Sequence, residues 1–293
     1  MAGQLPDSGE VFLDHVAHFV PAMEPAAEAL EGCGFRLTPF TRQTNWLDGG
    51  SVPTGTGNRC AMFRRGYVEI LTATGDTPLA RQLGERLTRH VGLHLAAFSA
   101  ADAAAEHRRL AAAGFPVVPL VDMRRPVATE NGEEWARFTI ARIAEGRMPE
   151  GRIQFLTHHT EALVWREPYL DHPNGALALN AMWIAAADPS DAAERFARLT
   201  GQPFGRGGET VTIRLDRGAV RVATPEHLER ELAIRPGPPL PYLAAYEVEV
   251  AGLSRLRALL ERSRLPGIPL GEGIGVRLPP AVGGTIVFRQ SPG

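Results

Sequence analysis

Four side chains that can bind a divalent metal occupy repeated positions in this chain, and they are His15, Glu69, His94 and Gln154. Each lies in a short apolar segment typical of a β-strand: FLDHVAHFV, YVEIL, GLHLAAF and RIQFL. Successive side chains of a strand point to opposite faces, so the apolar neighbours can face a helix while the polar group faces away. Two imidazoles, a carboxylate and an amide oxygen suit Zn, Ni, Co, Mn or Fe(II). The alternative is that the histidines are satisfied within their strands and that Glu69 lies at the rim of a sheet.

A second set of candidates follows the segment RIQFL. His158, His159 and Glu161 come directly after this expected strand, where a side chain could pass protons to or from a nearby site, since histidine titrates near neutrality. A solvated strand end is the alternative. Arg124 and Arg125 could clamp an anionic substrate, or could form a solvated pair.

The elements that must position these residues repeat along the chain. A strand, a helical stretch and three further strands occur in the same order four times, which predicts an α+β fold of four βαβββ modules. A turn-rich stretch, WREPYLDHPNG, separates the first two modules from the last two. We therefore expect two paired-module domains, at residues 11–165 and 175–290. Each pair also contains a Thr-Pro that begins an apparent helix, at Thr77 and Thr224.

The composition excludes several classes of protein. The 293 residues include no lysine, so Schiff-base chemistry and the phosphate-binding lysine of a P-loop are ruled out. A net charge of −2 does not favour nucleic acid or an anionic membrane as a partner. Two cysteines, no apolar run of about 20 residues and a polar N-terminus indicate a cytoplasmic protein. We expect a small-molecule substrate and either a monomer or a homodimer.

The module order, the opening LDHV and the pair YVEIL and GLHLAAF resemble the vicinal oxygen chelate superfamily, which is also called glyoxalase-like. It includes glyoxalase I, methylmalonyl-CoA epimerase, extradiol dioxygenases and bleomycin-resistance proteins. The resemblance implies a U-shaped sheet around a divalent metal, held by the first and fourth strands of each module at His15, Glu69, His94 and Gln154. In the C-terminal half the matching positions are taken to be Ala181, Arg221, Tyr246 and Val287, which predicts a metal-free copy.

The resemblance implies a metal-dependent enzyme of isomerase, lyase or oxygenase type that acts on a small, oxygen-rich substrate. Gln154 stands where glyoxalase I has a carboxylate that moves protons, and an amide cannot act as a base near neutral pH. We therefore do not expect a standard glutathione-dependent glyoxalase I. The alternative function is a non-catalytic protein of the same fold that sequesters a small molecule.

Overall fold

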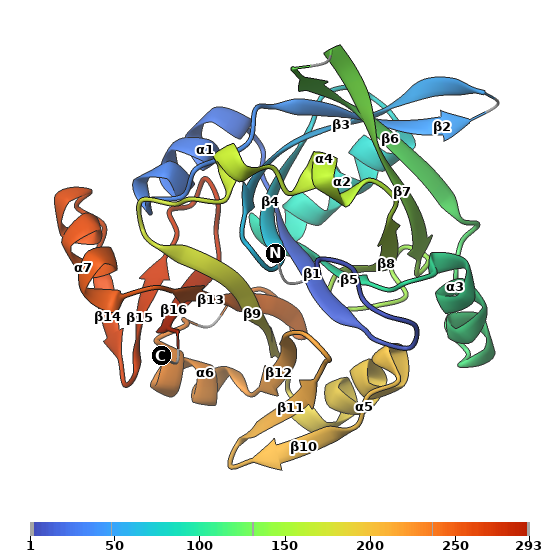
Figure 1. Ribbon diagram of the computed structural model, residues 1–293. Helices are drawn as coiled ribbons and strands as arrows, with labels where there is room; N and C mark the ends of the chain where they lie inside the picture. Colours follow the sequence, from blue (N-terminus) through green and yellow to red (C-terminus); the bar gives the residue numbers. More distant parts are fainter. Residues whose placement is uncertain (1–2, 48, 131, 236, 292–293) are drawn as a thin grey trace.

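The computed structural model describes residues 3–47, 49–130, 132–235 and 237–291. Its first two modules form a closed eight-stranded barrel with the strand order β1-β4-β3-β2-β6-β7-β8-β5 (Figure 1). The elements of the barrel half are β1 (Phe12–Phe19), α1 (Met23–Gly32), β2 (Thr41–Leu47), β3 (Gly50–Met62), β4 (Tyr67–Ala73), α2 (Pro78–Arg89), β5 (Gly92–Ser99), α3 (Ala103–Ala112), β6 (Val121–Thr129), β7 (Gly132–Arg142) and β8 (Arg152–His158).

The last two modules form an eight-stranded sheet with the order β10-β11-β12-β9-β13-β16-β15-β14. The short α4 (Glu161–Val164) and the 3-10 helix η1 (Glu167–Tyr169) connect the two halves. The elements of the second half are β9 (Ala176–Ala185), α5 (Pro189–Thr200), β10 (Phe204–Gly207), β11 (Thr210–Arg214), β12 (Ala219–Ala223), α6 (Pro225–Leu232), β13 (Tyr242–Val250), α7 (Leu253–Arg262), β14 (Gly267–Leu270), β15 (Gly273–Arg277) and β16 (Thr285–Gln290). The predicted α+β fold of paired βαβββ modules is confirmed.

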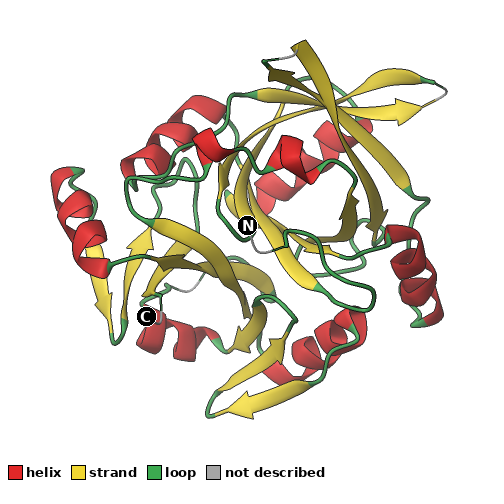
Figure 2. Cartoon of the chain, in the orientation of Figure 1, coloured by secondary structure: helices red, strands yellow, loops and turns green. Residues whose placement is uncertain are grey.

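The helices lie around the outside of the two sheets (Figure 2). The two Thr-Pro helices begin as the sequence predicts, because the hydroxyl of Thr77 accepts a hydrogen bond from the amide of Ala80, and Thr224 does the same for His227. Leu83 of α2 packs in the apolar cluster that lines the barrel. Leu228 of α6 belongs to the corresponding cluster of the second half. No helix among the described residues is long and apolar enough to cross a membrane.

The two halves share one large core. Val16 of β1 and Ala96 of β5 belong to the same cluster of buried side chains as Met182 of β9 and Val248 of β13. The first strands of all four modules therefore turn one face toward a common interior. In the first half their opposite faces line the inside of the barrel. In the C-terminal half they contribute to the apolar cluster that contains Leu228.

Each of these four strands contains an extra residue that leaves the ladder at a matching position, and β9 skips a second residue, Leu177, near its start. The pairing of β1 with β5 skips Asp14 on one strand and His94 on the other. The pairing of β9 with β13 skips Asn180 and Ala244 in the same way. Each skipped residue lies nine positions before the first residue of the following helix. A bulge of one residue shifts the alternation of side chains, so residues two apart across it face opposite sides of the sheet.

The bulges define which residues of the modules correspond. A leucine of the shared core precedes every bulge: Leu13, Leu93, Leu179 and Leu243. The residue after each bulge turns the other way, and the equivalents of His15 are therefore Leu95, Ala181 and Ala245. The sequence analysis matched Tyr246 to His94, whereas the bulges pair His94 with Ala244 and place Tyr246 one residue after Ala245, the equivalent of His15.

Candidate functional site

A small cavity of about 40 Å³ lies inside the barrel, between the fourth strands of the two modules. It brings together three of the four residues that the sequence singled out, His15 on β1, Glu69 on β4 and Gln154 on β8. The register explains their meeting, since Glu69 lies beside Ala17 of β1 and Gln154 lies beside Ala97 of β5. The remaining lining residues are Gln43, Asn58, Tyr67, Met123, Arg125, Phe138, Ile140 and Leu156.

His94 does not belong to this cavity. It is the bulge residue of β5, its Nε2 lies 2.8 Å from the carbonyl oxygen of His90, and its ring packs on the ring of His90 with a centroid distance of 3.9 Å. Burial lowers the pKa of His94 to about 3, with the neighbouring His90 acting in the same direction. The position that matches His15 holds the apolar Leu95.

A carboxylate–imidazole pair holds His15 in place. The Nδ1 of His15 lies 2.7 Å from one oxygen of Asp14, and its ring stacks on Tyr67 at a centroid distance of 4.3 Å. The other ring nitrogen, Nε2, faces Glu69 with 3.9 Å between Nε2 and Oε2. If Nδ1 carries the proton that it donates to Asp14, then Nε2 presents a free lone pair to the cavity.

Asp14 also contacts a second histidine. Its other oxygen lies 2.9 Å from Nε2 of His158, and both side chains are fully buried. Burial opposes ionisation of Asp14, but His158 and His15 outweigh it and hold the pKa of the carboxyl well below its ordinary value. Asp14 is therefore ionised at neutral pH and contacts two imidazoles. The sequence analysis missed it because strict alternation in the strand would turn it away from His15.

Polar side chains of β2 and β3 fix the Glu69 carboxylate. Its Oε1 accepts hydrogen bonds from Asn58 Nδ2 at 2.5 Å and from Gln43 Nε2 at 3.2 Å. The side-chain oxygen Oε1 of Gln43 accepts in turn from the hydroxyl of Thr56 at 2.8 Å. Glu69 is thus held with one oxygen occupied and the other directed at His15. Neither Asn58 nor Gln43 carried a signal in the sequence, since their place depends on which strands adjoin.

The donors around this cavity do not fit the four-ligand metal centre that the resemblance implies. Only His15 and Glu69 supply an imidazole and a carboxylate, and the oxygen of Gln154 accepts a hydrogen bond from Arg142 Nε at 3.2 Å. His94, the remaining expected ligand, does not line the cavity, and the position equivalent to His15 in the second module holds Leu95. Among the residues that the structure describes, no group of three or more His, Cys, Asp or Glu side chains is placed to hold a metal ion.

The three candidates at and just after the end of β8 lie in three different environments. His158 is buried behind His15, where its ring also packs on Trp165 at a centroid distance of 4.7 Å. His159 is on the outside of β7, with its Nε2 2.8 Å from the hydroxyl of Thr139. Glu161 begins α4 and lines neither cavity of the barrel. Of the three, the structure brings only His158 into contact with the site, through Asp14.

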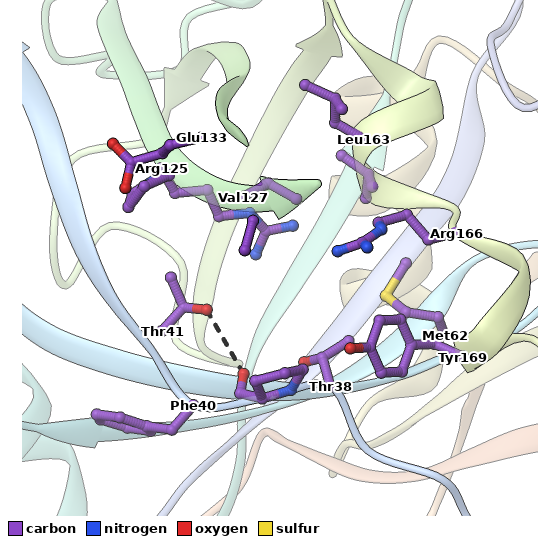
Figure 3. Close-up of a pocket in the computed structure, with 14 residues that line it drawn as sticks. Thr38, Phe40, Thr41, Met62, Arg125, Val127, Glu133, Leu163, Arg166 and Tyr169 are labelled. Carbon is purple, nitrogen blue, oxygen red and sulfur yellow. Dashed lines mark hydrogen bonds between the residues drawn. The ribbon is translucent and has the colours of Figure 1, made fainter. Parts of the chain in front are cut away.

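A larger pocket of about 390 Å³ opens next to the small cavity and shares Arg125 with it (Figure 3). Its walls come from the loop before β2, the end of β3, the strand β6 and the α4–η1 connection. Apolar side chains such as Met62, Val127 and Leu163 line it together with Arg166 and Tyr169. The larger pocket has room for a small molecule, and Arg125 is the residue that it shares with the small cavity.

Comparisons with known proteins agree with this architecture. The structure is similar to that of a hypothetical protein from Staphylococcus aureus, with a TM-score of 0.65 and 11% identity over 96% of this chain and 100% of the other. It is also similar to a mutant 4-hydroxymandelate synthase from Streptomyces coelicolor, with a TM-score of 0.56 and 14% identity over 97% of this chain and 93% of that one.

A third solved structure is a fusion of a xylose isomerase-like TIM barrel with a 4-hydroxyphenylpyruvate dioxygenase. It matches with a TM-score of 0.58 and 12% identity, over 99% of this chain and 51% of the fusion protein. No curated protein matches the chain. The family model described as a glyoxalase-like domain matches residues 13–200, which is more than half of the chain. This match and the paired βαβββ modules lead to one conclusion: the chain belongs to the glyoxalase-like domain family.

Proposed function

We propose that the protein is an enzyme that moves a proton on a small, oxygen-rich substrate in the inner cavity, with His15 as the base. The observation that supports this proposal is the Asp14–His15 pair, which leaves Nε2 of His15 open to the cavity. A buried carboxylate that accepts from Nδ1 fixes the orientation of the ring and stabilises the imidazolium formed when Nε2 takes up a proton.

The reaction type that suits this geometry is proton transfer at a carbon next to a carbonyl group. His15 Nε2 removes the proton, the C–H electron pair moves into the carbonyl to give an enolate, and the same proton returns to that carbon or to the oxygen. Arg125 lines the cavity and supplies the positive charge that stabilises the enolate oxygen. Burial raises the pKa of Tyr67 well above its ordinary value, with Asp14 acting in the same direction, so its hydroxyl stays protonated beside His15.

The donor set does not support a step through a metal ion, and the proposal uses none. This departs from the metal-dependent mechanism expected from the sequence. A specific feature also keeps the sequestering alternative open, because the outer pocket of about 390 Å³ is much larger than the cavity beside His15. A protein that only binds a molecule would use the outer pocket, and His15 would take no part in chemistry.

Deuterium exchange tests the proposal without knowledge of the natural substrate. The protein is incubated in D₂O with 2-oxobutyrate, 2-oxoglutarate and 4-phenyl-2-oxobutyrate, and loss of the proton at C3 is followed by NMR. We expect exchange above the buffer rate for at least one compound, and a loss of about 100-fold or more in His15→Gln, since a general base contributes roughly 10²–10⁴. The control is His159→Gln, which removes an exposed histidine of the same barrel and leaves the exchange unchanged.

Two results would contradict the proposal. If the wild type binds a compound but exchanges none, the sequestering function is favoured. If EDTA abolishes the exchange and a divalent ion restores it, the metal-dependent mechanism expected from the sequence is favoured instead.

A further inference from the structure

The outer pocket contains two arginines that face each other. The guanidinium groups of Arg125 on β6 and Arg166 on the α4–η1 connection both point into the middle of the pocket (Figure 3). Glu133, the one acidic residue among those that line this pocket, directs its carboxylate away from them (Figure 3). Among the described residues, neither arginine forms an ion pair.

Both side chains are held so that they stay in this arrangement. Arg125 lies over the ring of Phe138, with 5.2 Å from its Cζ to the ring centroid, and Arg166 lies over Tyr169 at 5.8 Å. The Nη1 of Arg36 donates to the carbonyl of Pro168 at 2.9 Å and anchors the connection that carries Arg166. Two half-buried like charges that face each other repel, and an anion placed between them is attracted to both and offsets that repulsion.

From this arrangement we infer that the outer pocket binds an anionic group between Arg125 and Arg166, attached to an apolar body. A carboxylate or a phosphate accepts paired N–H donors from a guanidinium, and each arginine offers several. The apolar body lies against Met62, Val127 and Leu163. The chemistry of the pocket therefore selects an amphipathic organic acid or phosphate ester.

This assignment extends the proposed function and rests on it in one respect, which is the direction of the bound molecule. Arg125 lines both cavities, so one edge of its guanidinium can face the outer anion while another faces the inner cavity. A molecule anchored by its acidic group at the arginines places its oxygen-bearing carbon toward His15. The substrate class is then an acid with a second oxygen function close to the first.

Calorimetric titration tests the anion site with 4-phenylbutyrate, the neutral 4-phenylbutyramide and phenyl phosphate. We expect the acid to bind and the amide not to bind, and we expect Arg166→Gln to weaken binding of the acid about 10- to 100-fold. Arg166→Lys keeps the charge and recovers part of the loss. Arg108→Gln, which removes an exposed arginine of α3, leaves the affinity unchanged. A lower dissociation constant for phenyl phosphate than for 4-phenylbutyrate identifies phosphate as the preferred anion.

Equal affinity for the acid and the amide, or unchanged affinity in Arg166→Gln, would overturn the inference. Thermal melting of each variant shows that the fold is intact, so a loss of binding is assigned to the charge. His15→Gln separates this inference from the proposed function. If His15→Gln binds the acid normally and the wild type shows no proton exchange, the proposed function fails while the anion site stands.

Discussion

Replacing Leu95 by histidine tests the correspondence between the two modules of the barrel. Leu95 is the residue after the bulge of β5, and it is equivalent to His15 after the bulge of β1. Its side chain is 3% exposed and belongs to the apolar cluster inside the barrel. Leu95→His adds a second imidazole on the face that carries His15 and Glu69, and so supplies the donor that a metal site of the expected type lacks.

The structure sets the size of the effect. Loss of a buried leucine costs about 1.5–3 kcal/mol, and burial of the imidazole without a partner adds about 1–3 kcal/mol, so we expect the variant to lose about 2.5–6 kcal/mol of folding free energy without metal. A metal ion at a free concentration 100 times its dissociation constant stabilises the folded variant by about 2.7 kcal/mol. That gain corresponds to a rise in Tm of roughly 4–5 °C for a chain of 293 residues.

Thermal melting with and without Co(II), together with the visible spectrum of bound Co(II), measures the outcome. The matched control is Leu93→His, because Leu93 precedes the bulge and lies in the core shared by the two halves. It should lose stability and gain nothing from the metal. If Leu95→His shows no metal-dependent rise in Tm, or if the wild type binds Co(II) and His94→Ala abolishes that binding, the argument from the bulges is refuted.

Three further predictions concern groups that the fold buries. His18, whose Nε2 lies 3.4 Å from the hydroxyl of Tyr246 across the two halves, has its pKa lowered by burial to about 4. As the pH falls below about 6.5, His18 becomes protonated in the unfolded chain before it does in the folded protein. Urea unfolding of the wild type should therefore show that the free energy of unfolding falls by about 2–3 kcal/mol more between pH 7 and pH 4.5 than in His18→Gln. An equal fall in the two proteins would contradict this. Asp14→Asn should cost about 2–4 kcal/mol at pH 7, since the amide cannot accept from both His15 and His158, and a value below 1 kcal/mol would show that the pair contributes little. Burial raises the pKa of the Cys33 and Cys60 thiols to about 12, so neither should react with a thiol reagent at pH 8 until denaturant is added, and rapid labelling of the native protein would be inconsistent with the core.

The order of elements could be predicted from the sequence because each module repeats the same hydrophobic pattern. The strand ends, the helices that begin at Thr77 and Thr224 and the meeting of His15, Glu69 and Gln154 all depend on local sequence or on repeated spacing. These features survive small errors of alignment, because neighbouring strands of one sheet bring whole segments together.

The placement of His94 could not be predicted in the same way. Side-chain alternation in a strand has a period of two, so one extra residue in the ladder reverses the face of everything beyond it. The only trace of the bulges in the sequence is the leucine that precedes each of them, and Leu93 aligned with Leu13 would have placed Leu95 opposite His15. The roles of Asp14 and Arg125 depend on side-chain contacts between distant strands, for which a single sequence carries no signal.

The repeated bulge also determines how the four modules can diverge. In each first strand it creates two adjacent positions with different tasks, one that faces the interior and one that lies behind it and can support it. In the first module these are His15, which we propose as the base, and Asp14, which accepts from its Nδ1. The other three modules keep the same backbone with Leu95, Ala181 and Ala245 at the interior position. The duplicated scaffold therefore offers three further pairs of adjacent positions, and in each of them two substitutions would place a histidine beside a carboxylate in the same backbone setting.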